Sequence, residues 1–312
     1  MTGLPGRLPP DGSIPTALAA RYARLADILR EAESVLVAYS GGVDSSLLAA
    51  VAYRALGPRA VAAIAVSPSL AADELAAARS VARTIGIWLR EVETHELDRE
   101  AYAANTPDRC YVCRGVVFAQ LATTAREEGL ACVVYGENAD DGRDHRPGAR
   151  AAIEAGVRAP LAEAGLTKAE VRALAHACGL PNWQKPAAPC LATRIPYGQP
   201  VTVEKLRQLE AAERLVRALG FREARVRHHG DVARVELLPD ELERAATPAV
   251  REAIVAGLRR LGFPYVALDL QGYRQGSLNE VLGVPNTDVP RARRPVPVSA
   301  GIPGRRQGQP DG

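Results

Sequence analysis

Four strand-like segments without regular polar alternation, separated by segments of helical periodicity, constrain the fold more than any other feature of this sequence. They lie at 34–39, 60–67, 87–94 and 131–138. Strands of this kind are typical of a parallel sheet that helices cover on both faces. We therefore predict an α/β fold with a parallel, doubly wound sheet, whose ligands bind beyond the carboxyl ends of the strands.

The pattern changes after residue 181. A proline-rich stretch at 182–202 is followed by a helix, strand-like segments and a further helix, which predicts a smaller α+β domain. The predicted parts are a disordered leader at 1–14, the α/β domain at 15–181, the α+β domain at 182–284 and a disordered Pro/Arg-rich tail at 285–312. Thr167 is expected to cap the last helix of the first domain.

The net charge of +3 does not indicate a nucleic-acid partner. Residues 283–312 hold five arginines and two aspartates, so this tail carries the whole positive excess and the remaining body is neutral. A protein that grips a long nucleic acid needs a basic surface on its folded part. The sequence also lacks a membrane-spanning apolar run and a secretory signal, so we expect a cytoplasmic protein.

The string S-G-G-V-D-S-S joins the first strand to a helix. Its glycines let backbone N–H groups approach an anion, its serines add hydroxyl donors, and the helix directs its positive end to the same place. Asp44 would repel a phosphate unless a cation lies between them, which implies Mg²⁺. The alternative is a plain turn that binds nothing. The candidate phosphate-binding residues are Ser40, Gly41, Gly42, Asp44, Ser45 and Ser46.

Five cysteines in a cytoplasmic chain indicate metal binding or catalysis rather than disulfides. Cys110 and Cys113 form a C-x-x-C pair. The pair could bind zinc with a fourth ligand, act as a redox dithiol, or consist of two buried thiols with no common function. Cys190 lies in the proline-rich stretch, four residues before Arg194, a cation that favours the thiolate. The alternative for Cys190 is a small buried apolar residue.

The glycine-rich string resembles the pyrophosphate loop (PP-loop) of N-type ATP pyrophosphatases, which cleave ATP between its α and β phosphates. The segments N-T-P-D-R-C-Y-V-C-R-G, G-E-N-A-D-D-G-R-D-H-R-P-G and P-C-L-A-T-R-I-P-Y-G, in this order, resemble the LarE family. This resemblance, over about residues 15–284, implies an ATP-dependent sulfurtransferase of nickel-pincer nucleotide (lactate racemase cofactor) biosynthesis. Such an enzyme adenylylates a carboxylate of pyridinium-3,5-biscarboxylic acid mononucleotide and converts it to a thiocarboxylic acid.

The resemblance implies two routes for the sulfur. In one, Cys190 gives up its own sulfur and becomes dehydroalanine. In the other, Cys110, Cys113 and Cys190 hold a [4Fe–4S] cluster whose fourth iron carries a hydrosulfide. The resemblance also places Ser67 beside the adenosine of ATP and implies a homo-oligomer, while the ultimate source of the sulfur stays open.

An enzyme that acts on a mononucleotide needs residues that bind the phosphate of the substrate. Arg225 and Arg227 alternate along a predicted strand, so they would project from one face and form an arginine clamp with Arg194. The alternative is a solvated strand face in an arginine-rich protein.

Several carboxylates are candidates for orienting Mg²⁺. Asp140, Asp141 and Asp144 follow a predicted strand end, although a plain hydrophilic loop is the alternative. Glu213 could hold a divalent ion or be ordinary surface charge, and Glu236 is expected to be surface charge.

Three other functions remain open on the sequence alone. A tRNA thiolase would also combine a PP-loop with cysteines. A non-catalytic adenine-nucleotide sensor would bind ATP without forming AMP. An amide-forming synthetase would respond to ammonia and would not need Cys190.

Overall fold

The computed structural model describes residues 14–141, 147–274 and 276–282. Most of the predicted leader, the predicted tail from residue 285, and Asp144 lie outside the described residues. The described residues up to Tyr273 form one compact unit, and the described part of the remaining chain contains a 3-10 helix at Ser277–Leu282. The domain boundaries predicted at 181 and 284 stay predictions.

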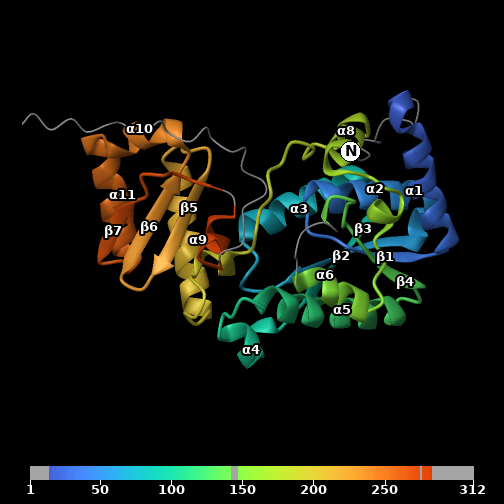
Figure 1. Cartoon of the computed structure of the whole chain (residues 1–312), viewed down its shortest axis with the longest axis horizontal. Coiled ribbons are helices and arrows are strands. Elements are labelled where there is room, and N and C mark those ends of the chain that lie inside the picture. Colours follow the sequence, from blue (N-terminus) through green and yellow to red (C-terminus); the bar gives the residue numbers. More distant parts are fainter. Residues whose placement is uncertain (1–13, 142–146, 275, 283–312) are drawn as a thin grey trace, which may run out of the picture. The chain divides into compact units, whose positions relative to one another are not determined.

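The first sheet has four strands in the order β3-β2-β1-β4, and every neighbouring pair is parallel (Figure 1). The strands are β1 (Val35–Ala38), β2 (Ala60–Val66), β3 (Trp88–Glu93) and β4 (Cys132–Tyr135). Each lies within one of the four predicted segments, so the parallel α/β prediction is confirmed. The carboxyl ends of β1, β2 and β4 meet at one edge of the sheet, because Val35 pairs with both Ala60 and Cys132.

Helices cover both faces of this sheet (Figure 1). On one face lie α1 (Ala19–Glu31), α2 (Val43–Leu56), α3 (Ala72–Ile85) and α8 (Lys168–Ala177); on the other lie α5 (Arg109–Glu127) and α6 (Pro147–Glu154). Val35 and Val37 belong to the core formed with the first group, whereas Leu36 packs in the core that contains Phe118 and Leu121 of α5. Burial on both faces explains why β1 is apolar throughout. The short helices α4 (Glu100–Ala103) and α7 (Pro160–Glu163) complete this part.

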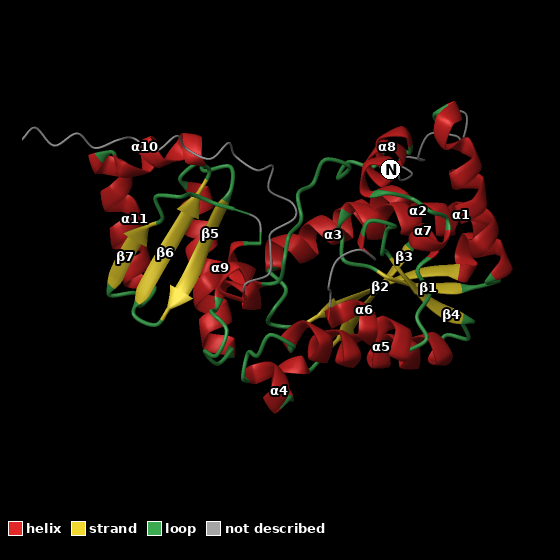
Figure 2. Cartoon of the chain, in the orientation of Figure 1, coloured by secondary structure: helices red, strands yellow, loops and turns green. Residues whose placement is uncertain are grey.

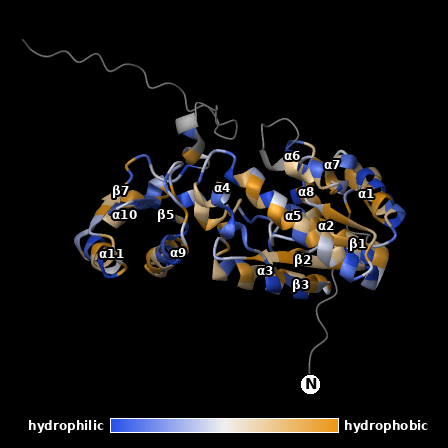
Figure 3. Cartoon of the chain, turned by 90° about the horizontal axis from the view of Figure 1, so that it is seen from below, coloured by the Kyte–Doolittle hydropathy of each residue, from blue (hydrophilic) through white to orange (hydrophobic). Residues whose placement is uncertain are grey.

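The second sheet has three strands in the order β5-β6-β7 (Figure 2). β5 (Ala224–His229) and β6 (Val232–Leu237) form an antiparallel hairpin, and β7 (Tyr265–Leu268) pairs with β6 in parallel. Helices α9 (Val203–Ala218) and α11 (Pro248–Arg260) lie next to each other on one face, and α10 (Leu242–Ala246) precedes α11 (Figure 3). This mixed sheet with its helices confirms the predicted α+β part of the fold.

The two faces of the second sheet differ in chemistry. Val226 and Val235 pack in a core with Leu209 of α9 and Leu258 of α11. The residues that alternate with these on β5 and β6 include Arg225, Arg227, Arg234 and Glu236, which carry part of the candidate site described below.

Thr167 caps α8 as predicted. Its side chain accepts a hydrogen bond from the backbone N–H of Glu170, whose carboxylate accepts one from the Thr167 N–H in return, which is a capping box. None of the helices in the described ranges is both long and apolar enough to span a membrane.

Candidate functional site

Residues 40–46 turn from the carboxyl end of β1 into α2. The hydroxyl oxygens of Ser40 and Ser45 lie 3.1 Å apart, and the Ser45 hydroxyl donates to the Gly42 carbonyl at 3.2 Å. The Gly42 N–H donates to Ser40 Oγ at 3.3 Å, and Gly42 is the N-cap of α2. The loop therefore gathers hydroxyls and the amino end of a 14-residue helix at one sheet edge, an arrangement that suits a phosphate.

Two glycines allow this loop to pack against its neighbours. Gly41 has a φ of +70°, and a Cβ atom there would lie 2.7 Å from the Cβ of Ala78. Gly136 directly follows β4, and a Cβ atom there would lie 2.8 Å from the backbone nitrogen of Ser45. Any larger residue at either position would displace the loop. Sequence reasoning selected Gly41 and missed Gly136, for which the available signal was its place after an apolar strand.

Asp44, in the first turn of α2, lies near two of the other predicted carboxylates, Asp140 and Asp141. It forms an ion pair with Lys168 and accepts a hydrogen bond from Asn138 at 3.4 Å. The backbone N–H of Lys168 donates to Asp140 at 2.8 Å, and the Asn138 amide donates to Asp141 at 2.7 Å. The structure thus brings Asp44, Asp140 and Asp141 together around one lysine and one asparagine.

Sequence reasoning missed Lys168 because the glycine-rich loop itself contains no lysine. The ammonium group comes instead from the start of α8, 124 residues after Asp44. The signal available was compositional: Lys168, Lys185 and Lys205 are the three lysines of a chain whose other basic residues are arginines.

The segment that carries Cys190 is hydrogen-bonded to loops at the carboxyl edge of the first sheet. Asn182, at its start, donates to the Gly41 carbonyl at 3.0 Å and to the Ser46 hydroxyl at 2.9 Å. The N–H of Leu191, next to Cys190, donates to the carbonyl of Ser69 at 2.9 Å. Both ends of the segment therefore contact loops at the carboxyl edge of the first sheet.

Ser67 follows β2, where the sequence predicted contact with adenosine. Its hydroxyl donates to the buried carboxylate of Glu96, and the N–H of Ser69 donates to Ser67 Oγ at 3.2 Å. These bonds order the turn after β2 beside the turn after β1.

The three predicted cysteines lie close enough to affect one another electrostatically. Cys110 and Cys113 are in the first turns of α5, and Cys190 directly precedes a 3-10 helix at Leu191–Arg194. Surrounding protein atoms raise the pKa of the Cys113 thiol, and the neighbouring Cys190 raises it further. The pKa of Cys190 is also raised by desolvation, although the residue is exposed, and the Arg109 guanidinium opposes that rise.

The described residues contain no group of three or more His, Cys, Asp or Glu side chains arranged to hold a metal ion. A structural zinc site would need its sulfurs about 2.3 Å from one point. A [4Fe–4S] cluster binds its cysteines through different irons, so its thiolates need not converge on one point. The three cysteines are chemically suited to the cluster, since three thiolates leave one iron open.

Arg194 holds the Cys190 loop. It is 4% exposed and donates to Glu213 at 2.8 Å and to the carbonyls of Pro189 and Cys190 at 2.6 and 3.0 Å. Glu213 also accepts a bond from Arg217 at 2.5 Å. Burial acts to raise the pKa of Glu213, but Arg194 and its other arginine neighbours lower it overall, so the carboxylate is ionised. Its described contacts are with arginines and one backbone N–H.

Arg225 and Arg227 project from one face of β5 and are buried, with 6% and 7% exposure, so the solvated-face alternative is wrong. Arg225 pairs with Glu223 at 3.2 Å and Arg227 with Glu236 at 2.7 Å. The prediction that Glu236 is surface charge is also wrong. Glu236 is 1% exposed because two arginines, Arg227 and Arg234, neutralise it within the protein.

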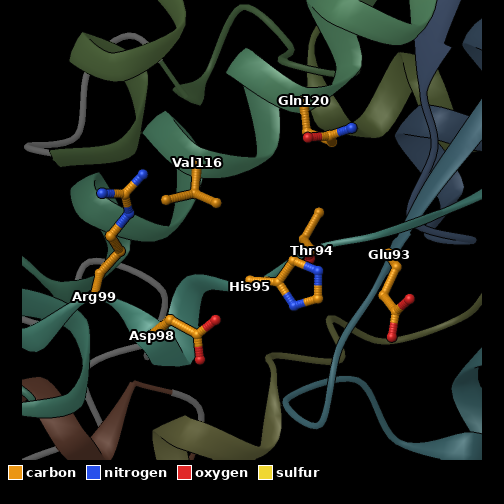
Figure 4. A pocket seen from close by; sticks show the side chains of 7 residues that line it. All are labelled: Glu93, Thr94, His95, Asp98, Arg99, Val116 and Gln120. Atoms are coloured by element: carbon orange, nitrogen blue, oxygen red, sulfur yellow. The ribbon is translucent and has the colours of Figure 1, made fainter.

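A cavity of about 260 Å³ is lined by other residues (Figure 4). Its lining residues either end β3, follow it or come from α5, and none is a predicted site residue: they are Glu93, Thr94, His95, Asp98, Arg99, Val116 and Gln120. The predicted site is instead built by loops and side chains at the sheet edge.

Comparison with known proteins identifies the family. The NAD synthase family profile matches residues 22–127, the part that contains the glycine-rich loop. An uncharacterized protein of Synechocystis sp. is 44% identical over 85% of this chain and 99% of its own length. The pyridinium-3,5-bisthiocarboxylic acid mononucleotide synthase of Lactiplantibacillus plantarum is 38% identical over 85% of this chain and 96% of its own. The chain belongs to the LarE family.

Membership in the LarE family makes the chain an ATP-dependent enzyme with a PP-loop. A further relative, the tRNA-specific 2-thiouridylase MnmA of Sphingopyxis alaskensis, is 33% identical over 40% of this chain and 37% of its own length. That similarity is partial, whereas the similarity to the LarE-type synthase extends through most of both chains.

Proposed function

We propose that this LarE-family enzyme inserts sulfur into pyridinium-3,5-biscarboxylic acid mononucleotide. It adenylylates a carboxylate of the substrate with ATP, releases pyrophosphate, and replaces the activated oxygen by sulfur. The observation that carries the proposal is the double attachment of the Cys190 segment, through Asn182 to the PP-loop and through Leu191 to Ser69. A nucleotide-activating loop and a sulfur-bearing loop are thereby parts of one hydrogen-bonded structure.

In the first step, a substrate carboxylate oxygen attacks the α-phosphorus of ATP, and the bond to the β-phosphate oxygen breaks. The PP-loop, with Ser40, Ser45 and the amino end of α2, would hold the leaving pyrophosphate. Asp44 would bind Mg²⁺ beside it, with Asp140 and Asp141 orienting the ion or its waters. Lys168, freed from Asp44 by the metal, would contact a phosphate oxygen.

In the second step, a sulfur nucleophile attacks the carbonyl carbon of the acyl adenylate, and AMP leaves with the original carboxylate oxygen. If the sulfur is that of Cys190, the Cβ–Sγ bond then breaks as the Cα proton is lost, which leaves dehydroalanine and a thiocarboxylate. Cys190 suits either route, because it is exposed at the start of a short helix and lies near two guanidinium groups.

The residues that would hold a [4Fe–4S] cluster are Cys110, Cys113 and Cys190. When bound, the cluster would supply an open iron that can carry a hydrosulfide and allow repeated turnover. Iron and acid-labile sulfide in anaerobically purified protein test this part. The cluster route predicts about four irons per chain that are lost in Cys110→Ala, whereas absence of iron would leave Cys190 itself as the donor.

The phosphate of the mononucleotide would bind at Arg225 and Arg227. Arg225 Nε is buried and has no hydrogen-bond partner among the described residues. Its N–H can therefore donate a hydrogen bond to an anion without losing an existing one. Arg194 would complete the clamp while holding the Cys190 loop, and Glu213 would keep Arg194 in place. The predicted homo-oligomer can be tested separately by light scattering.

Pyrophosphate release distinguishes this function from the alternatives. We expect release from Mg·ATP to depend on pyridinium-3,5-biscarboxylic acid mononucleotide and to be unaffected by added tRNA or ammonia. Stimulation by tRNA would favour a thiolase, an ammonia-dependent amide product would favour a synthetase, and ATP binding without AMP formation would favour a sensor. Any of these three results would overturn the proposal.

A further inference from the structure

Arg109 is a buried cation directly next to the cysteines. Arg109 is the first residue of α5 and directly precedes Cys110. The residue is 1% exposed. A guanidinium cannot lose its proton inside a protein, so it requires anionic or hydrogen-bonding partners where it is buried.

Arg109 differs in this respect from the other buried arginines of the described chain. Arg194, Arg225 and Arg227 each form an ion pair with a glutamate, at 2.8, 3.2 and 2.7 Å respectively. Within the described ranges Arg109 has no carboxylate partner at ion-pair distance, although it is the least exposed of the four. No acidic side chain of the described ranges therefore balances its charge.

One of the two terminal nitrogens of the Arg109 guanidinium, Nη1, donates hydrogen bonds, and the other, Nη2, does not do so among the described residues. Its Nη1 donates to Asn105 Oδ1 and to the carbonyl of Ala192 at 3.0 Å. Its Nη2 is buried and has no hydrogen-bond partner within the described part of the chain. A buried donor left unpaired is destabilising, so its presence indicates a partner that arrives during function.

Asn105 fixes Arg109 relative to the Cys190 loop. It is fully buried and has a φ of +56°, a conformation that non-glycine residues adopt rarely. Its amide nitrogen donates to the carbonyls of Ile195, Pro196 and Gln199 at 3.2, 2.8 and 3.0 Å, while its oxygen accepts from Arg109. The segment before the C-x-x-C pair is thereby attached to the segment after Cys190.

After desolvation by burial, the groups with the largest effect on the pKa of Arg109 are cysteine thiols. Cys190 and Cys110 are its first electrostatic partners, ahead of Tyr102 and Tyr197. Among the groups that favour the ionised form of Cys190, Arg109 ranks above Arg194, to which sequence reasoning had given this role. Arg109 also directly precedes Cys110, and the Ala192 carbonyl that accepts its hydrogen bond lies two residues after Cys190, so the groups next to the guanidinium that can become anions are sulfurs.

We propose that Arg109 is the cationic partner of the sulfur that is activated at Cys190, with its unpaired Nη2 N–H donating to that sulfur and Asn105 holding the guanidinium in place. The anionic sulfur would be a cysteine thiolate or a sulfide bound at the cysteines. Arg109 would stabilise it before attack on the acyl adenylate. This inference rests on the proposed sulfur transfer, but it concerns a residue outside the nucleotide and substrate-phosphate contacts.

The first test measures how fast iodoacetamide modifies Cys190 in the full chain, reduced and treated with chelator, by peptide mass spectrometry. We expect Arg109→Gln to slow the modification about ten-fold or more, because it removes the charge, and Arg109→Lys to stay within about three-fold of wild type. Cys132 in the same samples is an internal control, since its electrostatic neighbours are Arg158 and Glu163. Equal rates of Cys190 modification in wild type and Arg109→Gln would overturn the proposal. Equal slowing in Arg109→Gln and Arg109→Lys would also overturn it.

A second test does not depend on an Arg109 variant that folds. Cys190→Asp places a carboxylate at the sulfur position, and Cys190→Asn is its neutral match. We expect the Asp variant to have the higher thermal midpoint at neutral pH, because its charge would pair with Arg109. A midpoint equal to or below that of the Asn variant would contradict the assignment.

Neither test uses ATP or substrate, so the two proposals can fail separately. If the alkylation order holds but wild-type protein forms no thiocarboxylate, the proposed function fails, and only the pairing of Arg109 with the Cys190 sulfur stands. If product forms but Arg109 does not affect Cys190, the Arg109 assignment alone fails.

Discussion

Asn182 donates a hydrogen bond to the hydroxyl of Ser46 at 2.9 Å, although the two residues are 136 positions apart in the sequence. The same amide nitrogen donates to the Gly41 carbonyl at 3.0 Å. Asn182 is 8% exposed and opens the segment that leads to Cys190. The residue therefore stabilises the PP-loop from the side of the sulfur-bearing loop.

We expect Asn182→Ala to weaken binding of Mg·ATP. Loss of a buried donor to the loop costs about 1–3 kcal/mol, part of which would appear in nucleotide affinity. Isothermal titration calorimetry with a non-hydrolysable ATP analogue measures this effect. Gln184→Ala, an exposed residue two positions later, is the matched control and should bind like wild type. Equal affinities for both variants would contradict the role given to Asn182.

Lys168→Met should strongly reduce substrate-dependent AMP formation. The substitution removes the ammonium group that pairs with Asp44, leaves the length of the side chain similar, and makes the loop more negative toward ATP. We expect a loss of at least about ten-fold in rate, which corresponds to about 1.4 kcal/mol of transition-state stabilisation. Lys205→Met, at a lysine that donates to the Pro200 carbonyl, is the control. A rate for Lys168→Met within two-fold of that control would refute the role of Lys168 in AMP formation. Two-fold in rate corresponds to about 0.4 kcal/mol of activation free energy.

Glu213→Ala should destabilise the second sheet and its helices. It removes a buried carboxylate that pairs with Arg194 and Arg217, and it leaves Arg194 as a buried charge without its partner. Such a change costs about 3–5 kcal/mol. On the same helix, Arg214 is 56% exposed and pairs with Glu210 at 3.4 Å, so Arg214→Ala should cost about 1 kcal/mol or less. Chemical denaturation gives both values, and similar losses would show that burial of the ion pair is unimportant.

The stability of the folded chain should fall as the pH drops below about 6.5, the ordinary pKa of histidine. Burial lowers the pKa of His228 in the folded chain, and Lys205 lowers it further. The unfolded chain therefore binds more protons than the folded chain in this range, so acid favours unfolding. Urea denaturation between pH 7 and 5 should show a shallower decline for His228→Gln than for wild type. Parallel declines would exclude a contribution from His228.

The strands, the PP-loop and the Thr167 cap were predictable because each depends on neighbouring residues. Continuous apolar segments indicated β1, β2 and β4, and the serine- and glycine-rich string indicated the turn into α2. Local patterns of this kind carry their own physical cause, which is burial of a strand or satisfaction of backbone N–H groups.

Lys168, Asn182 and Arg109 were not predictable because their partners lie far along the chain. Lys168 is 124 residues from Asp44, and Arg109 is 83 residues from Ala192. The error at Glu236 has the same origin: a single sequence does not show that Arg227 and Arg234 surround that carboxylate and allow its burial.

Mass spectrometry of pyridinium-3,5-biscarboxylic acid mononucleotide, after incubation with Mg·ATP and the anaerobically purified enzyme, is the decisive experiment for sulfur transfer at Cys190. We expect a product in which sulfur replaces one carboxylate oxygen, formed by wild type and by Cys132→Ala but not by Cys190→Ala. Formation of that product by Cys190→Ala at the wild-type rate, or no product with wild type under conditions where AMP forms, would contradict sulfur transfer at Cys190.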